Sequence, residues 1–202
     1  MNRFLFFAGL LIVGESRLAA QRVSNWTAKL TPCDQSKELL KRGHMDIGVW
    51  VNTSDAVLTA EFRHAMNFWA NVLDMTWHEE DTPQCSVQVA YGGPSLFNND
   101  VVAARSQFVD GQNFHGWIAF NPKCKLSRTD TYLTAIHEFG HMLGLRHNPN
   151  PKSIMYFLDP DDPPLLDPKD LTCLMARHKV RDPEATLKAS ARALFKTISN
   201  TQ

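Results

Sequence analysis

Three histidines and a glutamate lie close together in the chain at a spacing that suits a metal ion. His137, Glu138 and His141 form the pattern H-E-x-x-H. On a helix, residues four apart lie on one face, so both imidazoles can reach one ion while Glu138 lies beside a metal-bound water. Gly144 can take the left-handed conformation that ends a helix, which would return His147 as a third nitrogen ligand. Three protein ligands plus water are typical of a catalytic zinc.

The alternative is a buried amphipathic helix that carries histidines by chance. Several apolar residues in the same stretch have the character of core residues, namely Ile136, Phe139, Leu143 and Leu145. Packing therefore explains part of the helix. The fixed spacing of the five residues of the H-E-x-x-H-x-x-G-x-x-H pattern favours the zinc site.

The stretch His137-Glu138-x-x-His141-x-x-Gly144-x-x-His147, followed by Met155-Tyr156, resembles the metzincin clan of zinc endopeptidases. The step of eight residues from His147 to Met155 resembles its matrixin branch. This resemblance implies an α+β fold: a twisted, mostly parallel five-stranded sheet with one antiparallel edge strand, packed on helices, with the active-site helix and a Met-turn below the cleft. It also implies that Met155 packs beneath the zinc without binding it. Phe157 replaces the tyrosine ligand of astacin-like relatives, so no tyrosine ligand is expected.

Hydrophobic periodicity predicts the elements that must position this site. A helix should begin at Ser54 or Asp55, a second should carry the histidines, and a third should begin at Asp167. The predicted strands cover residues 45–51, 74–80, 86–91, 101–108 and 117–120. The resemblance makes 101–108 the exposed edge strand, to which an extended substrate peptide can add.

The chain departs from the matrixin pattern in two places. Residues 109–123 hold one histidine, His115, which we interpret as a loop residue and not a ligand, so one catalytic zinc is expected and no second zinc. Asp100, Asp110 and backbone carbonyls leave only weak calcium binding open. Near the third helix, only Asp170 matches an acidic pair of the family, and it could brace the Met155 turn or simply cap the helix.

Composition bounds the function further. The chain has 202 residues, 44% of them hydrophobic, and equal numbers of basic and acidic side chains, 21 each. Neither nucleic acid nor an anionic membrane is therefore an expected partner. Residues 1–20 have the form of a secretory signal, with an uncleaved buried helix as the alternative, and no other run approaches membrane-spanning length. The predicted organisation is a signal peptide at 1–20, an N-terminal segment at 21–44, a metzincin-like catalytic domain at 45–180 and a C-terminal helical tail at 181–202.

The four cysteines and two sequons bear on an extracellular location. Secretion favours disulfides among Cys33, Cys85, Cys124 and Cys173, and three pairings stay open. Cys33 as a propeptide cysteine that blocks the zinc is a second interpretation, which its neighbours Thr31-Pro32 and Asp34 do not favour. Asn25 and Asn52 are candidate glycosylation sites.

These patterns predict a secreted, monomeric zinc metalloendopeptidase that acts on proteins or peptides. His137, His141 and His147 would bind the zinc, and Glu138 would activate the zinc-bound water and pass its proton to the leaving amine. A secreted zinc-containing binding or inhibitory protein without proteolytic activity is the alternative. A zinc hydrolase confined to the ends of small peptides is a third hypothesis.

Overall fold

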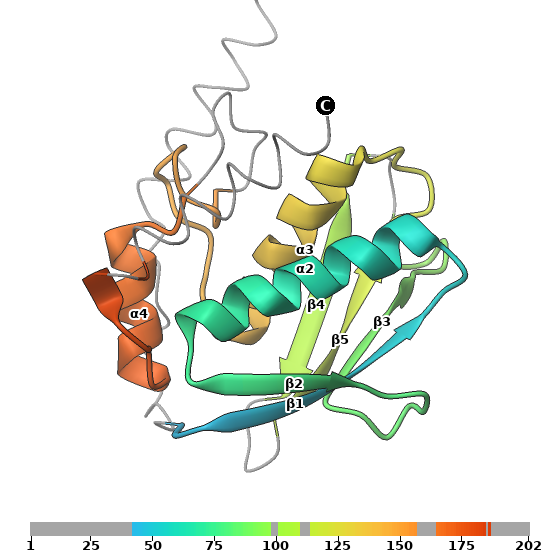
Figure 1. Cartoon of the computed structure of the whole chain (residues 1–202). Helices are drawn as coiled ribbons and strands as arrows, with labels where there is room; N and C mark the ends of the chain where they lie inside the picture. The colour runs from blue at the N-terminus through green and yellow to red at the C-terminus, as the bar shows by residue number, and fades with distance from the viewer. Residues whose placement is uncertain (1–41, 98–100, 110–113, 157–164, 185, 187–202) are drawn as a thin grey trace, which may run out of the picture.

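The computed structural model describes residues 42–97, 101–109, 114–156, 165–184 and 186, in which five strands form one sheet beside three helices (Figure 1). The elements in chain order are β1 (Met45–Asn52), α2 (Ala56–Val72), β2 (Met75–Glu79), β3 (Val87–Tyr91), β4 (Ala104–Val109), β5 (His115–Phe120), α3 (Arg128–Met142) and α4 (Pro168–Arg177). This is the predicted α+β architecture with the predicted order of elements.

The sheet is parallel except at one edge. Its strand order is β2-β1-β3-β5-β4, and β4 pairs with β5 in the antiparallel direction. The predicted edge strand is confirmed, although it begins at Ala104 and not at residue 101. The Asn121 backbone N–H still donates to the Ala103 carbonyl at 2.8 Å, but the Val102 carbonyl accepts from the Asn121 side chain at 2.9 Å and not from a strand N–H. A side-chain amide thus takes the place of a backbone donor at Val102, and the ladder begins at Ala104.

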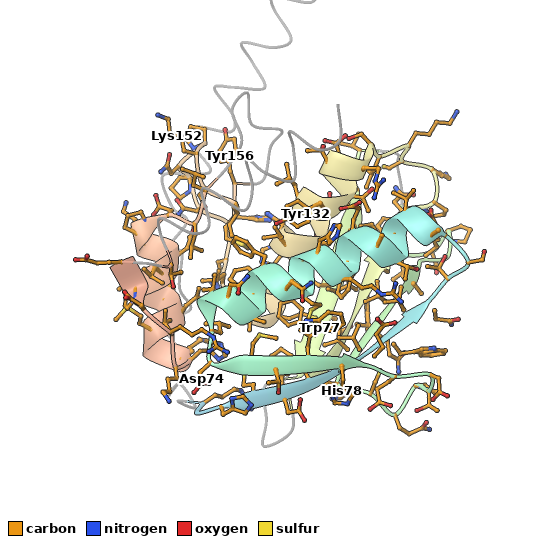
Figure 2. All side chains as sticks on the ribbon, in the orientation of Figure 1. Asp74, Trp77, His78, Tyr132, Lys152 and Tyr156 are labelled. Carbon is orange, nitrogen blue, oxygen red and sulfur yellow. The ribbon has the colours of Figure 1, made fainter. Side chains whose placement is uncertain are left out.

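Helix α2 crosses one face of the sheet and buries an apolar stripe against it (Figure 1). Asp55 caps the helix, because its carboxylate accepts hydrogen bonds from the N–H groups of Val57 and Leu58. The alternation of β2 is visible in Figure 2: Trp77 points toward α2, where its indole N–H donates to Asn67 at 3.0 Å, and His78 points away. Period-two alternation and a 3.6-residue helical stripe thus meet in one core.

Helix α3 packs beside α2, and α4 stands next to the C-terminal end of α2 (Figure 1). The chain after α4 is hydrogen-bonded to the C-terminal end of α2. The Arg181 backbone N–H donates to the Val72 carbonyl at 3.0 Å, and its guanidinium donates to the carbonyls of Ala70 and Leu73, both at 2.9 Å. The described start of the predicted 181–202 tail is therefore anchored to the domain.

Several sequence predictions fall outside the described residues. They are the signal peptide at 1–20, nearly all of the 21–44 segment with Asn25 and Cys33, the acidic residues Asp100 and Asp110, and most of the tail. His115 is the first residue of β5 and is exposed, so the expected loop position was wrong. Among the described helices, none is long and apolar enough to cross a membrane.

Candidate metal centre

Helix α3 carries two of the three histidines, and its first turn is fixed in two ways. Ser127 and Asp130 form a capping box at its start. Arg128 donates from Nε and Nη2 to one carboxylate oxygen of Glu61 in α2, at 2.9 and 2.7 Å. The Glu61 side chain is 1% exposed and that of Arg128 is 54% exposed, so this ion pair joins the two helices at the edge of the core. Farther along, the indole N–H of Trp69 donates to the Ile136 carbonyl at 3.2 Å.

A glycine turn at the end of α3 returns the chain toward the helix. The Gly144 N–H donates to the His141 carbonyl at 2.9 Å, and the Leu145 N–H donates to the Gly140 carbonyl at 3.0 Å. These two bonds make a Schellman motif, in which the residue after the cap adopts a left-handed conformation. Gly144 has φ +87°, a value that residues with a Cβ rarely adopt. The predicted glycine turn is confirmed.

The turn brings the third histidine to the other two. The ring centroids of His137 and His141 are 4.7 Å apart, those of His141 and His147 4.8 Å, and those of His137 and His147 5.3 Å. One ring nitrogen from each lies within 4.8 Å of the other two. Among the residues that the structure describes, this is the one such cluster of histidine, cysteine or acidic side chains.

Hydrogen bonds on the far side of two rings leave the inner nitrogens available. His137 Nδ1 donates to the Ile154 carbonyl and His141 Nδ1 donates to the Leu145 carbonyl, both at 2.9 Å. Each ring therefore keeps Nε2 as an unprotonated acceptor, the arrangement that orients histidine ligands. Burial and repulsion from His141 lower the pKa of His137 to about 3 and that of His147 to about 4. These two rings are neutral at pH 7, as metal binding requires, and three imidazole side chains are a donor set that suits zinc.

The predicted Met-turn lies directly against α3. Met155 is fully buried, and a Cβ added at Gly140 would come within 2.6 Å of its sulfur. Glycine in the helix therefore makes room for the thioether beside the two histidines of that helix. The Ser153 hydroxyl accepts a hydrogen bond from the Met155 N–H at 2.9 Å.

Asp170 of α4 stabilises the Met-turn through two hydrogen bonds. Its two oxygens accept from the Asn148 amide at 2.8 Å and from the Ser153 hydroxyl at 2.5 Å. Asn148 follows His147, and Ser153 precedes the carbonyl that holds His137, so one buried carboxylate supports both sides of the histidine cluster. Burial raises the pKa of Asp170 to about 6, and its hydrogen bonds oppose that rise.

Glu138 points from α3 toward the edge strand. Its carboxylate Oε2 accepts a hydrogen bond from the Ser106 hydroxyl in β4 at 2.6 Å, and the residue is 7% exposed. Burial raises the pKa of Glu138, while the Ser106 hydrogen bond and the charges of His141 and Arg105 act in the opposite direction. A buried carboxylate on the helix that carries His137 and His141 is suited to accept and return a proton.

The family model for matrixins, a peptidase family, matches residues 49–172 of this chain. The chain belongs to the matrixin family. Its residues are 68% identical over 28 residues to macrophage metalloelastase of Rattus norvegicus, over 14% of this chain and 6% of that protein. They are 28% identical over 104 residues to matrix metalloproteinase-26 of Homo sapiens, over 46% of this chain and 39% of that protein. The matches thus span well under half the length of either relative.

The cysteines of this matrixin domain do not all form the disulfides that secretion would favour. Cys173 is disulfide-bonded, whereas Cys85 and Cys124 form no disulfide. Cys85 precedes β3 and Cys124 follows β5, and these neighbouring strands are parallel. The two thiols therefore lie at opposite ends of the sheet, too far apart for a disulfide without a large backbone movement.

Sequence reasoning missed the residues that orient this matrixin site from other elements. Ser106 had a weak signal, because alternation in a strand places it on the same face as the buried Ala104. Nothing in the sequence pointed to the Glu61–Arg128 pair, since the two residues are far apart in the chain.

Proposed function

We propose that this chain is a secreted zinc-dependent endopeptidase in which His137, His141 and His147 bind one zinc ion and Glu138 is the general base. The observation that carries the proposal is the convergence of three ring nitrogens within 4.8 Å, beside a buried carboxylate on the same helix. A bound zinc ion supplies Lewis acidity, which polarises a carbonyl and acidifies water.

In this proposal some residues of the site would hold the ion and another would transfer a proton. The three imidazoles would hold the ion through the ring nitrogens that lie within 4.8 Å of one another. Glu138 would take a proton from the attacking water at Oε1, the oxygen that the Ser106 hydrogen bond leaves free, and return it to the leaving amine. Met155 would fill the space under the ligands without coordinating.

The edge strand supports a peptide as the substrate. β4 pairs on one side with β5 and is the last strand of the sheet, so the main-chain groups of its other side can bind an extended chain as a further strand. The Ser106–Glu138 hydrogen bond joins β4 to α3 next to the histidine cluster. A peptide lying along β4 would therefore run past the general base. Such main-chain binding favours cleavage inside a polypeptide over removal of terminal residues.

The proposed organisation keeps residues 1–20 as a signal peptide, 21–44 as an N-terminal segment, 45–180 as the catalytic domain and 181–202 as a C-terminal tail, in a monomer. The resemblance to matrixins supports secretion, and so does the apolar run that follows Arg3. Asn52 is exposed at the end of β1, as a glycosylated asparagine must be.

The experiment is cleavage of casein and of internally quenched peptides by the zinc-loaded protein, with and without a chelator. We expect internal cleavage that a chelator abolishes and added zinc restores. Glu138→Gln should keep the zinc and lose activity by about a hundredfold to ten-thousandfold, because general-base catalysis contributes about that much. Zinc binding without any cleavage would instead support a binding or inhibitory protein, and products shortened only at their ends would support an exopeptidase.

A further inference from the structure

Ser106 is held firmly in the position from which it contacts Glu138. It pairs in the ladder with Ile118 of β5, which is 1% exposed. Ala104, on the same face of β4, is 6% exposed and belongs to the core. The hydroxyl therefore reaches the glutamate from a strand that the core of the sheet fixes, and the 2.6 Å hydrogen bond has a defined geometry.

The hydrogen bond restricts a side chain that would otherwise rotate. A glutamate has three side-chain torsions, and the last of them is broad, so that either oxygen can face a reacting group. The backbone of Glu138 is fixed in α3, but nothing in a helix chooses between the two oxygens. The Ser106 hydroxyl limits rotation about the last torsion, because it donates to Oε2, and Oε1 lies outside this hydrogen bond.

We propose that Ser106 is a positioning residue that holds the Glu138 carboxylate in the orientation for proton transfer. This inference rests on the proposed function, in which Glu138 is the general base. The strand that carries Ser106 is also the strand to which a substrate peptide would add. One strand would then place both the base and the peptide bond, so their relative position would not depend on the packing of α3 alone.

A purely structural role makes a different prediction. If the hydroxyl only satisfied a buried carboxylate, its removal would lower stability and leave the catalytic rate of the folded protein unchanged. A positioning role lowers kcat in the folded, zinc-loaded enzyme and leaves KM near its original value.

The experiment compares two variants of nearly equal shape in the full-length, zinc-loaded protein. Ser106→Thr keeps the hydroxyl and Ser106→Val removes it, and both are favourable residues in a strand. We expect Ser106→Thr to stay close to the parent and Ser106→Val to lose about tenfold to a hundredfold in kcat, the usual effect of removing a residue that orients a metal-site group. KM should change less than about twofold, which is the split expected when an interaction serves the transition state and not ground-state binding. Ser95→Ala, at an exposed turn away from β4, is the control for loss of a serine hydroxyl.

Two further measurements separate positioning from folding. In the Glu138→Gln background, Ser106→Val should cause no additional loss, because the group that Ser106 orients is no longer a base. A crystal structure of metal-free Ser106→Val should show the Glu138 carboxylate in a rotamer different from the parent, or in more than one. A single unchanged rotamer would overturn the proposal.

The outcomes also separate this inference from the function on which it rests. A parent protein that binds zinc but cleaves no internal peptide bond overturns the proposed function and this inference with it. An active parent with an unchanged kcat in Ser106→Val overturns the positioning role alone. A rise in KM with unchanged kcat also overturns it, because Ser106 would then act in substrate binding.

Discussion

Replacing Gly144 with alanine tests the turn that brings His147 to the other two histidines. Gly144 has φ +87°, and a Cβ at this position would lie 2.2 Å from Nη1 of Arg177, the last residue of α4. Arg177 is 8% exposed, so its guanidinium has little room to withdraw. Two costs therefore add: the left-handed backbone of a residue with a Cβ, and the overpacking against Arg177.

The magnitude follows from these two costs and one gain. A left-handed conformation costs an alanine about 1–2 kcal/mol. Overpacking costs about 1–3 kcal/mol, and alanine recovers about 0.4–1 kcal/mol by restricting the unfolded chain. We expect Gly144→Ala to lower the free energy of unfolding by about 3 kcal/mol, or roughly 10 °C in Tm for a domain of this size. Because His147 follows the turn, zinc affinity should also fall, by about tenfold or more.

The assay is urea denaturation of the metal-free protein, followed by tryptophan fluorescence, with zinc affinity measured by competition with a chelator. Gly93→Ala is the matched control, because its Cβ would meet nothing within 4 Å and its φ is not positive. That variant should equal the parent or exceed it by up to about 1 kcal/mol. In an Arg177→Ala background the Gly144→Ala cost should shrink, which isolates the steric part. Equal stability of Gly144→Ala and Gly93→Ala would refute this explanation of the turn.

Three other changes test separate parts of the site. Gly140→Ala would place a Cβ within 2.6 Å of the Met155 sulfur, so we expect a loss of about 1–3 kcal/mol in urea denaturation, and a variant as stable as the parent would contradict the packing of the Met-turn. Burial raises the pKa of Asp170 from 3.8 to about 6, so as the pH rises through this range the unfolded chain releases a proton that the folded chain retains. The metal-free parent should therefore lose about 2 kcal/mol of stability between pH 4 and pH 7 relative to Asp170→Asn, and parallel stability curves from urea denaturation would contradict the raised pKa of Asp170 in the folded protein. Zinc at about a thousand times its Kd should stabilise the protein by about 4 kcal/mol, so the Tm in scanning calorimetry should fall when a chelator removes the metal. An unchanged Tm would mean that zinc does not bind the folded state in preference to the unfolded state.

The sequence predicted those parts of the fold that depend on local periodicity. The apolar stripe of α2, the alternation in β1 and the cap at Asp55 are properties of short segments, and each element appeared close to the expected bounds. The histidine spacing and Gly144 are local in the same sense. Met155 and the bracing role of Asp170 came from the resemblance to a family and not from periodicity.

Contacts between distant segments were not predictable in the same way. Alternation indicates which face of β4 carries Ser106, but not which side chain of α3 lies opposite, because that depends on how the helix packs on the sheet. The Glu61–Arg128 pair joins residues 67 positions apart, and no pattern in either helix signals it. The start of β4 was wrong by three positions for a similar reason, since the Asn121 side chain, from another segment, donates to the Val102 carbonyl in place of a strand N–H.

The most direct measurement of the central claim is zinc binding by the purified protein and by three single variants, His137→Ala, His141→Ala and His147→Ala. Zinc content from elemental analysis, together with affinity from chelator competition, should give one tightly bound ion per parent chain. Each variant should lose affinity by about a hundredfold or more, since removing one of three ligands breaks the set that zinc requires. A folded parent that binds no zinc, or a variant that binds it as tightly as the parent, would contradict the assignment of these three histidines as the metal centre.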